Sequence, residues 1–218
     1  MVHSPAEPAS PMPKRPGRKR DNDAEDRILR SAVDVFTAEG WRGFRLDAVA
    51  KAAGVGKSTI YLRYPTREVL LLEVLDTHGY AVAMNAQDHG SVRADLSAFA
   101  HTYAEWLEGP AGLFNIRLVA EIRLNPDLAE VTQAEFNASI SHSHQIVRRA
   151  KRRGEVPPRA SSALILDTVI GTLTQHVLSS PGKAPYASPA GRKFVDDLVE
   201  MVLRGVGVAG LNDSTPLT

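Results

Sequence analysis

The sequence predicts an all-α protein that divides into a small basic N-terminal domain and a larger, mildly acidic C-terminal domain. After about the first twenty residues, apolar side chains recur at the three- and four-residue spacing of amphipathic helices. Prolines and glycines stand where one helical segment gives way to the next. The charge changes sign between the two parts, with twelve Lys and Arg against seven Asp and Glu from Lys14 to Tyr64, and fourteen against seventeen from Pro65 to Thr218.

Residues 1–20 are expected to form a disordered basic arm. They are rich in proline, alanine and serine, and their positive charge lies in Lys14-Arg15-Pro16-Gly17-Arg18-Lys19-Arg20. No apolar stretch follows this cluster, so it does not have the pattern of a signal peptide. Such an arm can neutralise phosphates or enter a minor groove of DNA, and a solubilising tail is the alternative.

Residues 21–66 are expected to form a compact domain of three helices. The first helix can be capped at about Asp23 and ends at Gly40, with an apolar stripe that packs inward. This stripe contains Ile28, Leu29, Ala32, Val33 and Phe36. Trp41 and Phe44 follow the helix and should complete the core together with apolar residues of the next two helices.

Two incompatible hypotheses compete for Leu46–Pro65, which reads LDAVAKAAGVGKSTIYLRYP. The string Gly56-Lys57-Ser58-Thr59 resembles the end of a nucleotide-binding P-loop. That motif requires a glycine five residues before Gly56, where this chain has Lys51. It also requires a buried strand upstream, where this chain has an alanine-rich segment with a helical apolar stripe. A nucleoside triphosphatase is therefore the disfavoured alternative.

The helical interpretation accounts for the whole window. A helix over Leu46–Ala53 places its apolar residues at i, i+3, i+4 and i+7, and Gly54 takes the left-handed position that follows. A short second helix begins at Lys57 and ends before Pro65, because the residue that precedes a proline is pushed out of α space. Two short helices joined by a tight glycine turn are the helix-turn-helix motif.

These residues also resemble a known family. Arg27–Leu75 is similar in order and spacing to the DNA-binding domain of TetR-family transcriptional repressors. The shared pattern comprises Ile28, Leu29, Ala32, Phe36, Glu39-Gly40-Trp41, Val49-Ala50-Lys51-Ala52-Ala53-Gly54-Val55, Lys57, Thr59-Ile60-Tyr61, Tyr64-Pro65 and Glu68. The chain departs from it at Gly56, where many members have serine, and at Arg45, where threonine is frequent. The resemblance implies a three-helix DNA-binding domain followed by an α-helical ligand-binding and dimerisation domain.

The second helix of the motif and its flanks supply the candidate DNA contacts. The resemblance implies that Lys57, Thr59 and Tyr61 mostly contact the DNA backbone, although part of Tyr61 can instead fill the core. The full set of candidate DNA-binding residues is Arg18, Lys19, Arg20, Arg45, Gly56, Lys57, Ser58, Thr59, Tyr61, Leu62, Arg63, Tyr64 and Arg67.

Base readout is then expected from Ser58, Leu62 and Arg63. Arg63 can donate two hydrogen bonds to one guanine. An arginine at position 45 can still reach a phosphate.

Residues 67–207 are expected to form the helical regulatory domain, with a loose tail at 208–218. Helices are predicted over about 66–84, 91–107, 111–124, 126–153, 160–178 and 190–205. Gly109-Pro110, Asn125-Pro126 and Pro157-Pro158 mark three of the breaks between them.

The resemblance implies that this domain binds a small molecule and forms a dimer. The candidate ligand-binding residues are Tyr103, Trp106, Phe114, Leu118 and His142, with ordinary core packing as the alternative. The candidate dimer-interface residues, from the last two helices, are Ile165, Thr172, Val195, Val199 and Val202, with completion of the monomer core as the alternative. A dimer suits DNA because two recognition helices must enter major grooves about one turn (~34 Å) apart.

No enzymatic activity, cofactor or metal site is expected. The chain has no cysteine, which excludes disulfides and thiolate metal sites. His142 and His144 lie two residues apart and therefore point to different faces of a helix. No apolar run approaches the roughly 18 residues needed to cross a bilayer, so we expect a soluble, cytoplasmic protein without a membrane partner.

Three functional hypotheses follow from the sequence. The first is a homodimeric repressor that releases a palindromic double-stranded operator when an unidentified small-molecule effector binds. The second is a nucleoid-type protein that binds DNA with little sequence preference. The third is the disfavoured nucleoside triphosphatase.

Overall fold

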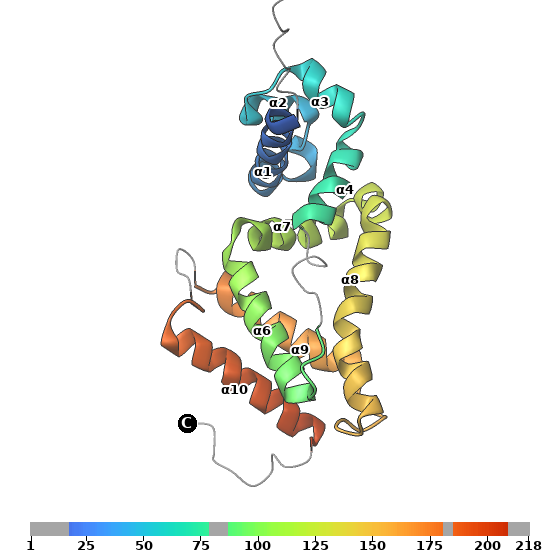
Figure 1. Cartoon of the computed structure of the whole chain (residues 1–218), viewed down its shortest axis with the longest axis vertical. Coiled ribbons are helices and arrows are strands. Elements are labelled where there is room, and N and C mark those ends of the chain that lie inside the picture. Colours follow the sequence, from blue (N-terminus) through green and yellow to red (C-terminus); the bar gives the residue numbers. More distant parts are fainter. Residues whose placement is uncertain (1–17, 79–86, 181–184, 209–218) are drawn as a thin grey trace, which may run out of the picture.

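The computed structural model describes residues 18–78, 87–180 and 185–208, and within these ranges it is helical and has no strand. The predicted all-α fold is confirmed. The molecule is elongated, with a small head at one end and a larger body at the other (Figure 1). The head consists of α1 (Arg18–Gly43), α2 (Leu46–Ala53), α3 (Lys57–Arg63) and α4 (Arg67–His78), which leads down to the body. The body consists of α6 (Val92–Glu108), α7 (Pro110–Leu124), α8 (Pro126–Arg152), α9 (Ser162–Leu178) and α10 (Pro189–Val206).

Helix α1 differs from the prediction at its start. It begins at Arg18, so Arg18, Lys19 and Arg20 belong to the helix and not to a disordered arm. The physical reason is that arginine and lysine are good helix formers and no proline or glycine separates them from the helix that follows. Residues 1–17 of the expected arm and 209–218 of the expected tail lie outside the described residues.

Gly40 breaks α1 where the sequence predicts its end. Its backbone angles are φ 66° and ψ −171°, a region open almost exclusively to glycine. A side chain at this position would also collide with Arg117 and Glu121 of α7. Those atoms are the ends of long side chains that can shift, so it is the backbone kink that requires glycine.

The turn between α2 and α3 follows the prediction closely. Gly54 is left-handed, with φ 65° and ψ 35°, and Val55 donates its backbone N–H to the carbonyl of Ala50 at 3.0 Å. Helix α3 begins after Gly56, and Tyr64 ends it by donating its N–H to the carbonyl of Ile60 at 2.8 Å. The helix-turn-helix predicted from spacing is therefore present.

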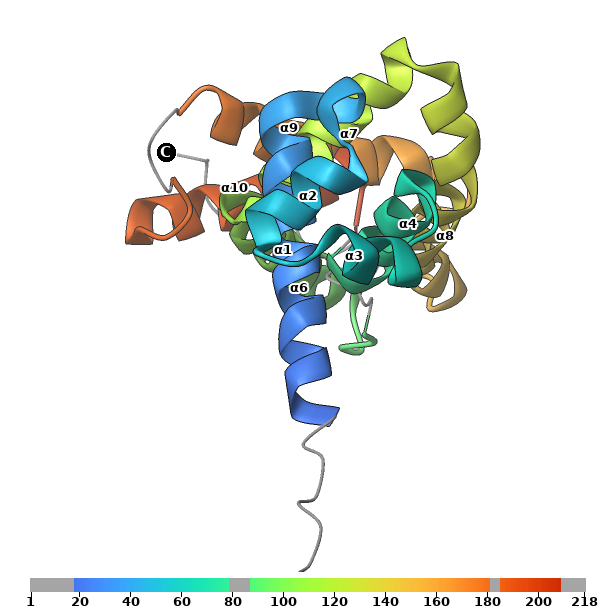
Figure 2. The same ribbon diagram turned by 90° about the horizontal axis from the view of Figure 1, so that it is seen from above.

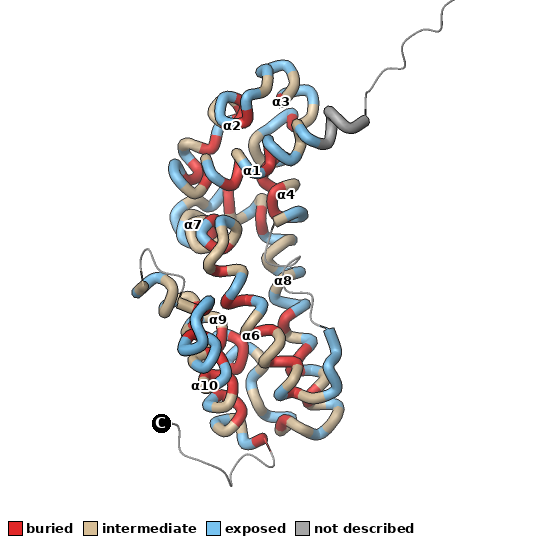
Figure 3. Tube along the Cα trace, turned by 60° about the vertical axis from the view of Figure 1, so that its left-hand side comes forward, coloured by how far each residue is buried: buried red, intermediate tan, exposed pale blue. Residues whose placement is uncertain are grey.

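The core of the head continues into the body. Phe36 lies edge-on to Phe44, with ring centroids 5.4 Å apart, and 5.0 Å from Phe114 of α7. Leu118 of α7 and Leu128 of α8 are fully buried in the same cluster. Buried segments accordingly recur along α1, α4 and α7 where the two parts meet (Figure 3). The head is thus packed onto α7 and is not merely tethered by α4.

The helices of the body begin at recognisable capping residues. Ser91, Ser161 and Ser188 each accept a backbone N–H from the first turn of α6, α9 and α10, at 3.2, 3.2 and 3.0 Å. Helices α6, α9 and α10 bury a second apolar cluster that contains Leu96, Val169 and Leu173. Within the described ranges, none of the helices combines the length and apolarity needed to cross a bilayer.

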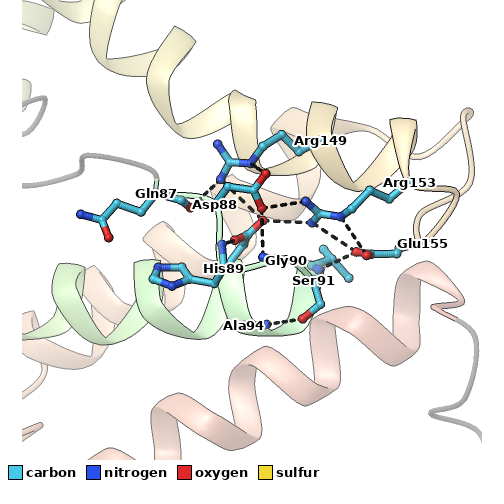
Figure 4. Close-up of polar contacts among 11 residues, drawn as sticks. Gln87, Asp88, His89, Gly90, Ser91, Ala94, Arg149, Arg153 and Glu155 are labelled. Atoms are coloured by element: carbon cyan, nitrogen blue, oxygen red, sulfur yellow. Dashed lines mark hydrogen bonds and ion pairs between the residues drawn. The ribbon is translucent and has the colours of Figure 1, made fainter.

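A buried carboxylate ties the start of α6 to the end of α8 (Figure 4). The side chain of Asp95 accepts the backbone N–H of His89 at 2.6 Å and the Arg153 guanidinium at 3.0 Å, and Arg149 lies 3.5 Å away. Arg153 also donates to Glu155 at 2.8 Å. These partners compensate the desolvation of Asp95, so the network clamps the end of the body that lies away from α3.

Candidate nucleic-acid interface

Helix α3 lies at the outer end of the head, where α2 and α3 are uncovered (Figures 1 and 2). It buries Ile60 against the head core and turns its other face to solvent. Leu62 is 88% exposed and Tyr61 is 49% exposed. A single exposed leucine is ordinary on a protein surface. Leu62, however, shares one helix face with Tyr61 and the exposed Ser58, so the three form a continuous contact surface.

The start of α3 is anchored to α2 by an ion pair. The Nζ of Lys57 donates to Oδ2 of Asp47 at 2.7 Å, and both side chains are largely exposed. This hydrogen bond lowers the pKa of the Asp47 carboxyl and raises the pKa of the Lys57 ammonium. An exposed pair of this kind contributes little to stability, so Lys57 can exchange Asp47 for a phosphate.

The candidate DNA-binding residues at the end of α3 and the start of α4 contact other residues of the head. Arg63 lies 3.7 Å from Glu25 of α1. Arg67 stacks over the Trp41 ring, 3.7 Å from its centroid, and donates to the Trp41 carbonyl at 2.7 Å. Tyr64 is only 5% exposed, and burial raises the pKa of its hydroxyl. The ring of Tyr64 belongs to the head core, and its contact with DNA stays a prediction.

The remaining candidates flank α2 and α3. Arg45 is exposed and precedes the first turn of α2. Thr59 is half-buried. Gly56 has an extended backbone, and a Cβ there would lie 3.7 Å from Oγ1 of Thr59 and 3.8 Å from Oγ of Ser58, which is ordinary contact. Glycine is therefore not required at position 56. The side chains of Arg18, Lys19 and Arg20 lie outside the described part.

The same geometry removes the P-loop alternative. A P-loop needs a buried strand and a glycine-rich loop before its lysine. Lys57 is preceded by α2 and a short turn over residues 54–56, with no strand in this stretch. Gly56 and Lys57 therefore stand at the start of helix α3 and do not form a P-loop.

A second candidate site is a cavity of about 350 Å³ in the body. Its walls come from α4, α6, α7, α8 and α9. The lining residues are Leu75, Tyr103, Asn115, Val119, Glu135, Phe136, Ser139, Ile140, Ser143, His144, Ala163, Leu166, Asp167 and Ile170. Of the residues predicted to bind a ligand, Tyr103 lines this cavity, and its hydroxyl is hydrogen-bonded to Thr174 at 2.9 Å.

The other four predicted ligand-binding residues lie elsewhere. Phe114 and Leu118 are buried in the core between head and body. Trp106 packs against the Tyr103 ring, outside the cavity lining. His142 is exposed, and His144, two residues on, faces the cavity instead. Apolar periodicity identified buried helix faces, but it could not separate faces that pack tightly from faces that leave a space.

Both domains match models of one family of regulators. Residues 28–74 match the model described as bacterial regulatory proteins, tetR family. Residues 86–202 match the model described as tetracyclin repressor-like, C-terminal domain. The chain belongs to the TetR family. It is a helix-turn-helix transcriptional regulator.

Relatives and solved structures agree with this TetR-family assignment. The chain is 28% identical over 165 residues to the transcriptional regulator AqdR of Rhodococcus erythropolis, covering 75% of this chain and 79% of the relative. It is 25% identical over 178 residues to the DNA-binding transcriptional repressor TetR of Mycobacteroides abscessus, covering 81% and 92%. The fold resembles that of FadR from Bacillus subtilis in complex with stearoyl-CoA, with a TM-score of 0.65, 20% identity and coverage of 84% and 99%.

The last two helices of this TetR-family chain leave an apolar groove of about 640 Å³ on the surface. Leu164 of α9 is 68% exposed and Met201 of α10 is 48% exposed along it. Ile165 and Val202, both predicted interface residues, form part of its lining although they are nearly buried. Thr172 is half-buried in an adjoining depression on α9.

The prediction for Val195 and Val199 is corrected. Both are at most 2% exposed and belong to the monomer core between α6, α9 and α10. The face of α10 that carries Val195 and Val199 is buried against other helices of the same chain. The apolar surface that stays exposed on α9 and α10 includes Leu164 and Met201 instead.

Proposed function

We propose that this TetR-family regulator is a ligand-responsive repressor. It binds a near-palindromic operator as a homodimer and releases the operator when a small molecule occupies the body cavity. The observation that carries the proposal is that the cavity is lined by the two helices that support the head. Leu75 belongs to α4, and Asn115 and Val119 belong to α7.

Through α4 and α7, a ligand in the cavity can change the position of α3. Helix α4 follows α3 after the short segment 64–66. Helix α7 inserts Phe114 into the head core, 5.0 Å from Phe36 of α1. A molecule that changes the spacing between α4 and α7 therefore shifts the head relative to the body. It favours release only if it binds the released arrangement more tightly than the DNA-bound one.

The geometry of DNA and the surface of α9 and α10 both support a homodimer. Each chain carries one recognition helix, and reading a palindrome takes two of them in successive major grooves. The apolar groove beside Leu164 and Met201 is suited to a second copy, because contiguous exposed apolar surface marks interaction sites. The name of the Mycobacteroides abscessus relative, a transcriptional repressor, supports repression as the mode of action.

A nuclease footprint on the DNA upstream of the protein's own gene tests the proposal. The full chain should protect one discrete, near-palindromic segment at moderate salt. Uniform coverage would instead favour the nucleoid-type alternative, and absence of protection at moderate salt would contradict the repressor.

Light scattering after size exclusion tests the dimer. Leu164→Glu should convert a dimer to a monomer and abolish the footprint. Leu113→Glu places the same charge at another exposed leucine, 48% exposed on α7, and should leave both unchanged. A dimer that survives Leu164→Glu would move the interface away from this groove.

A further inference from the structure

The cavity in the body carries an unusual charge pattern for a binding site. Glu135 of α8 and Asp167 of α9 both line it, and among its described lining residues there is no lysine or arginine. Within the described part of the chain, neither carboxylate has a hydrogen-bond or ion-pair partner for its side chain. Residues 79–86, outside the described ranges, also have no charged residue in their sequence. Besides the imidazole of His144, the described lining therefore offers these two carboxylates no basic side chain.

The rest of the wall is mainly apolar. Val119, Ile140, Leu166 and Ile170 supply aliphatic surface from α7, α8 and α9. Phe136 and Tyr103 add aromatic rings, whose faces attract cations. At about 350 Å³, the cavity is at the lower end of the range of ligand sites, ~300–1,000 Å³. Its occupant must be small and mostly apolar.

A carboxylate in partly apolar surroundings loses hydration that a ligand can restore. Glu135 is half-buried, and Asp167 is exposed and so lies at the mouth of the cavity. A protonated amine beside either carboxylate gains a charge-assisted hydrogen bond. A fatty acid or an acyl thioester of a nucleotide carries an anionic head, which the same two groups repel.

We propose that the effector of this regulator is an amphiphilic amine. Its ammonium group is held by Glu135 and Asp167, and its apolar body lies against α7 and the aromatic rings. The inference rests on the proposed function, because it assigns a ligand class to the cavity that controls the head. It makes this regulator a sensor of lipophilic bases.

Three ligands that share a dodecyl chain and differ in the charge of the head group separate the contribution of charge from that of hydrophobic contact. Dodecylamine, dodecanol and dodecanoate, each below its micelle threshold, are titrated calorimetrically into the full chain at neutral pH. Dodecylamine should bind about tenfold or more tightly than dodecanol, and dodecanoate should bind most weakly. Equal or tighter binding of dodecanoate would overturn the proposal, as would failure of all three probes to bind.

Matched variants test whether Glu135 and Asp167 bind the amine. Glu135→Gln and Asp167→Asn should each weaken dodecylamine about tenfold and leave dodecanol within about twofold. Glu130→Gln, on the exposed surface of α8 outside the cavity, should change neither. Dodecylamine binding that is insensitive to both cavity substitutions would place the amine elsewhere and refute the assignment. Melting temperatures of the variants confirm that each remains folded.

Release of DNA distinguishes this inference from the proposed function. Dodecylamine should remove the footprint of the parent protein, and Glu135→Gln should require about tenfold more of it. If the footprint is discrete but dodecanoate is what removes it, the ligand class is wrong and the repressor stands. If no discrete footprint exists, the repressor fails, and the calorimetric order of the probes still decides whether the cavity selects amines.

Discussion

Leu62→Ala separates DNA recognition from stability more cleanly than any other change on α3. The side chain is 88% exposed, so its loss should change the free energy of unfolding by less than about 0.5 kcal/mol. In a complex with DNA, the substitution removes three carbons, each worth about 0.8 kcal/mol when buried. If the DNA covers about half of that surface, the loss is roughly 1.2 kcal/mol per half-site. Two half-sites in a dimer then weaken operator binding about 50-fold.

Fluorescence anisotropy with a labelled operator duplex measures this loss, and a scrambled duplex of the same composition serves as reference. Because an apolar contact to a base edge reads sequence, Leu62→Ala should weaken the operator complex and leave the scrambled duplex unchanged. Leu124→Ala is the matched control, since Leu124 is 77% exposed on α7, away from α3. Unchanged affinity, or an equal loss on both duplexes, would refute base readout by Leu62.

Three further substitutions test the head. Gly56→Ser adds a capping hydroxyl to α3 without a clash, so operator affinity should stay equal or rise by up to about threefold in the anisotropy assay, and a large loss would contradict the geometry at the start of α3. Gly40→Ala forces alanine into a glycine-only backbone region, so chemical denaturation should show a free energy of unfolding lower by about 2 kcal/mol, whereas an unchanged midpoint would exclude the kink. Lys57→Ala removes one phosphate contact from each chain, so DNA binding should weaken and the dependence of log K on log salt should become shallower by about one unit per chain; an unchanged slope would mean that Lys57 does not reach a phosphate.

The helix boundaries were predictable because their signals are local. Gly54 adopts the left-handed conformation that its position after an apolar stripe indicated. Pro110 and Pro126 stand in the first turns of α7 and α8, where their missing N–H costs nothing. The exposed face of α3 was predicted only in part: Ile60 is buried as expected, whereas Tyr61, which was also expected to contribute to the core, is 49% exposed.

Side-chain partners across the chain were not predictable in this way. Asp95 and Arg153 meet only because α6 and α8 pack together, 58 residues apart in sequence. Tyr64 is among the candidate DNA contacts, and the sequence held no signal that its ring packs in the head core with 5% exposure. Such contacts depend on how helices are arranged, and a single sequence holds no local signal for that arrangement.

The sequence by itself determined the all-α fold and the helix-turn-helix, because caps, breakers and apolar periodicity act over a few residues, and the resemblance carried by Arg27–Leu75 indicated the family. The tertiary structure alone decided which apolar helix faces are buried within the monomer. It buried Val195 and Val199 in the monomer and left Leu164 and Met201 free. It also opened a cavity between helices and brought Glu135 and Asp167 to its walls. The physical reason is that an apolar stripe shows that a helix face will be covered, whereas only packing decides what covers it.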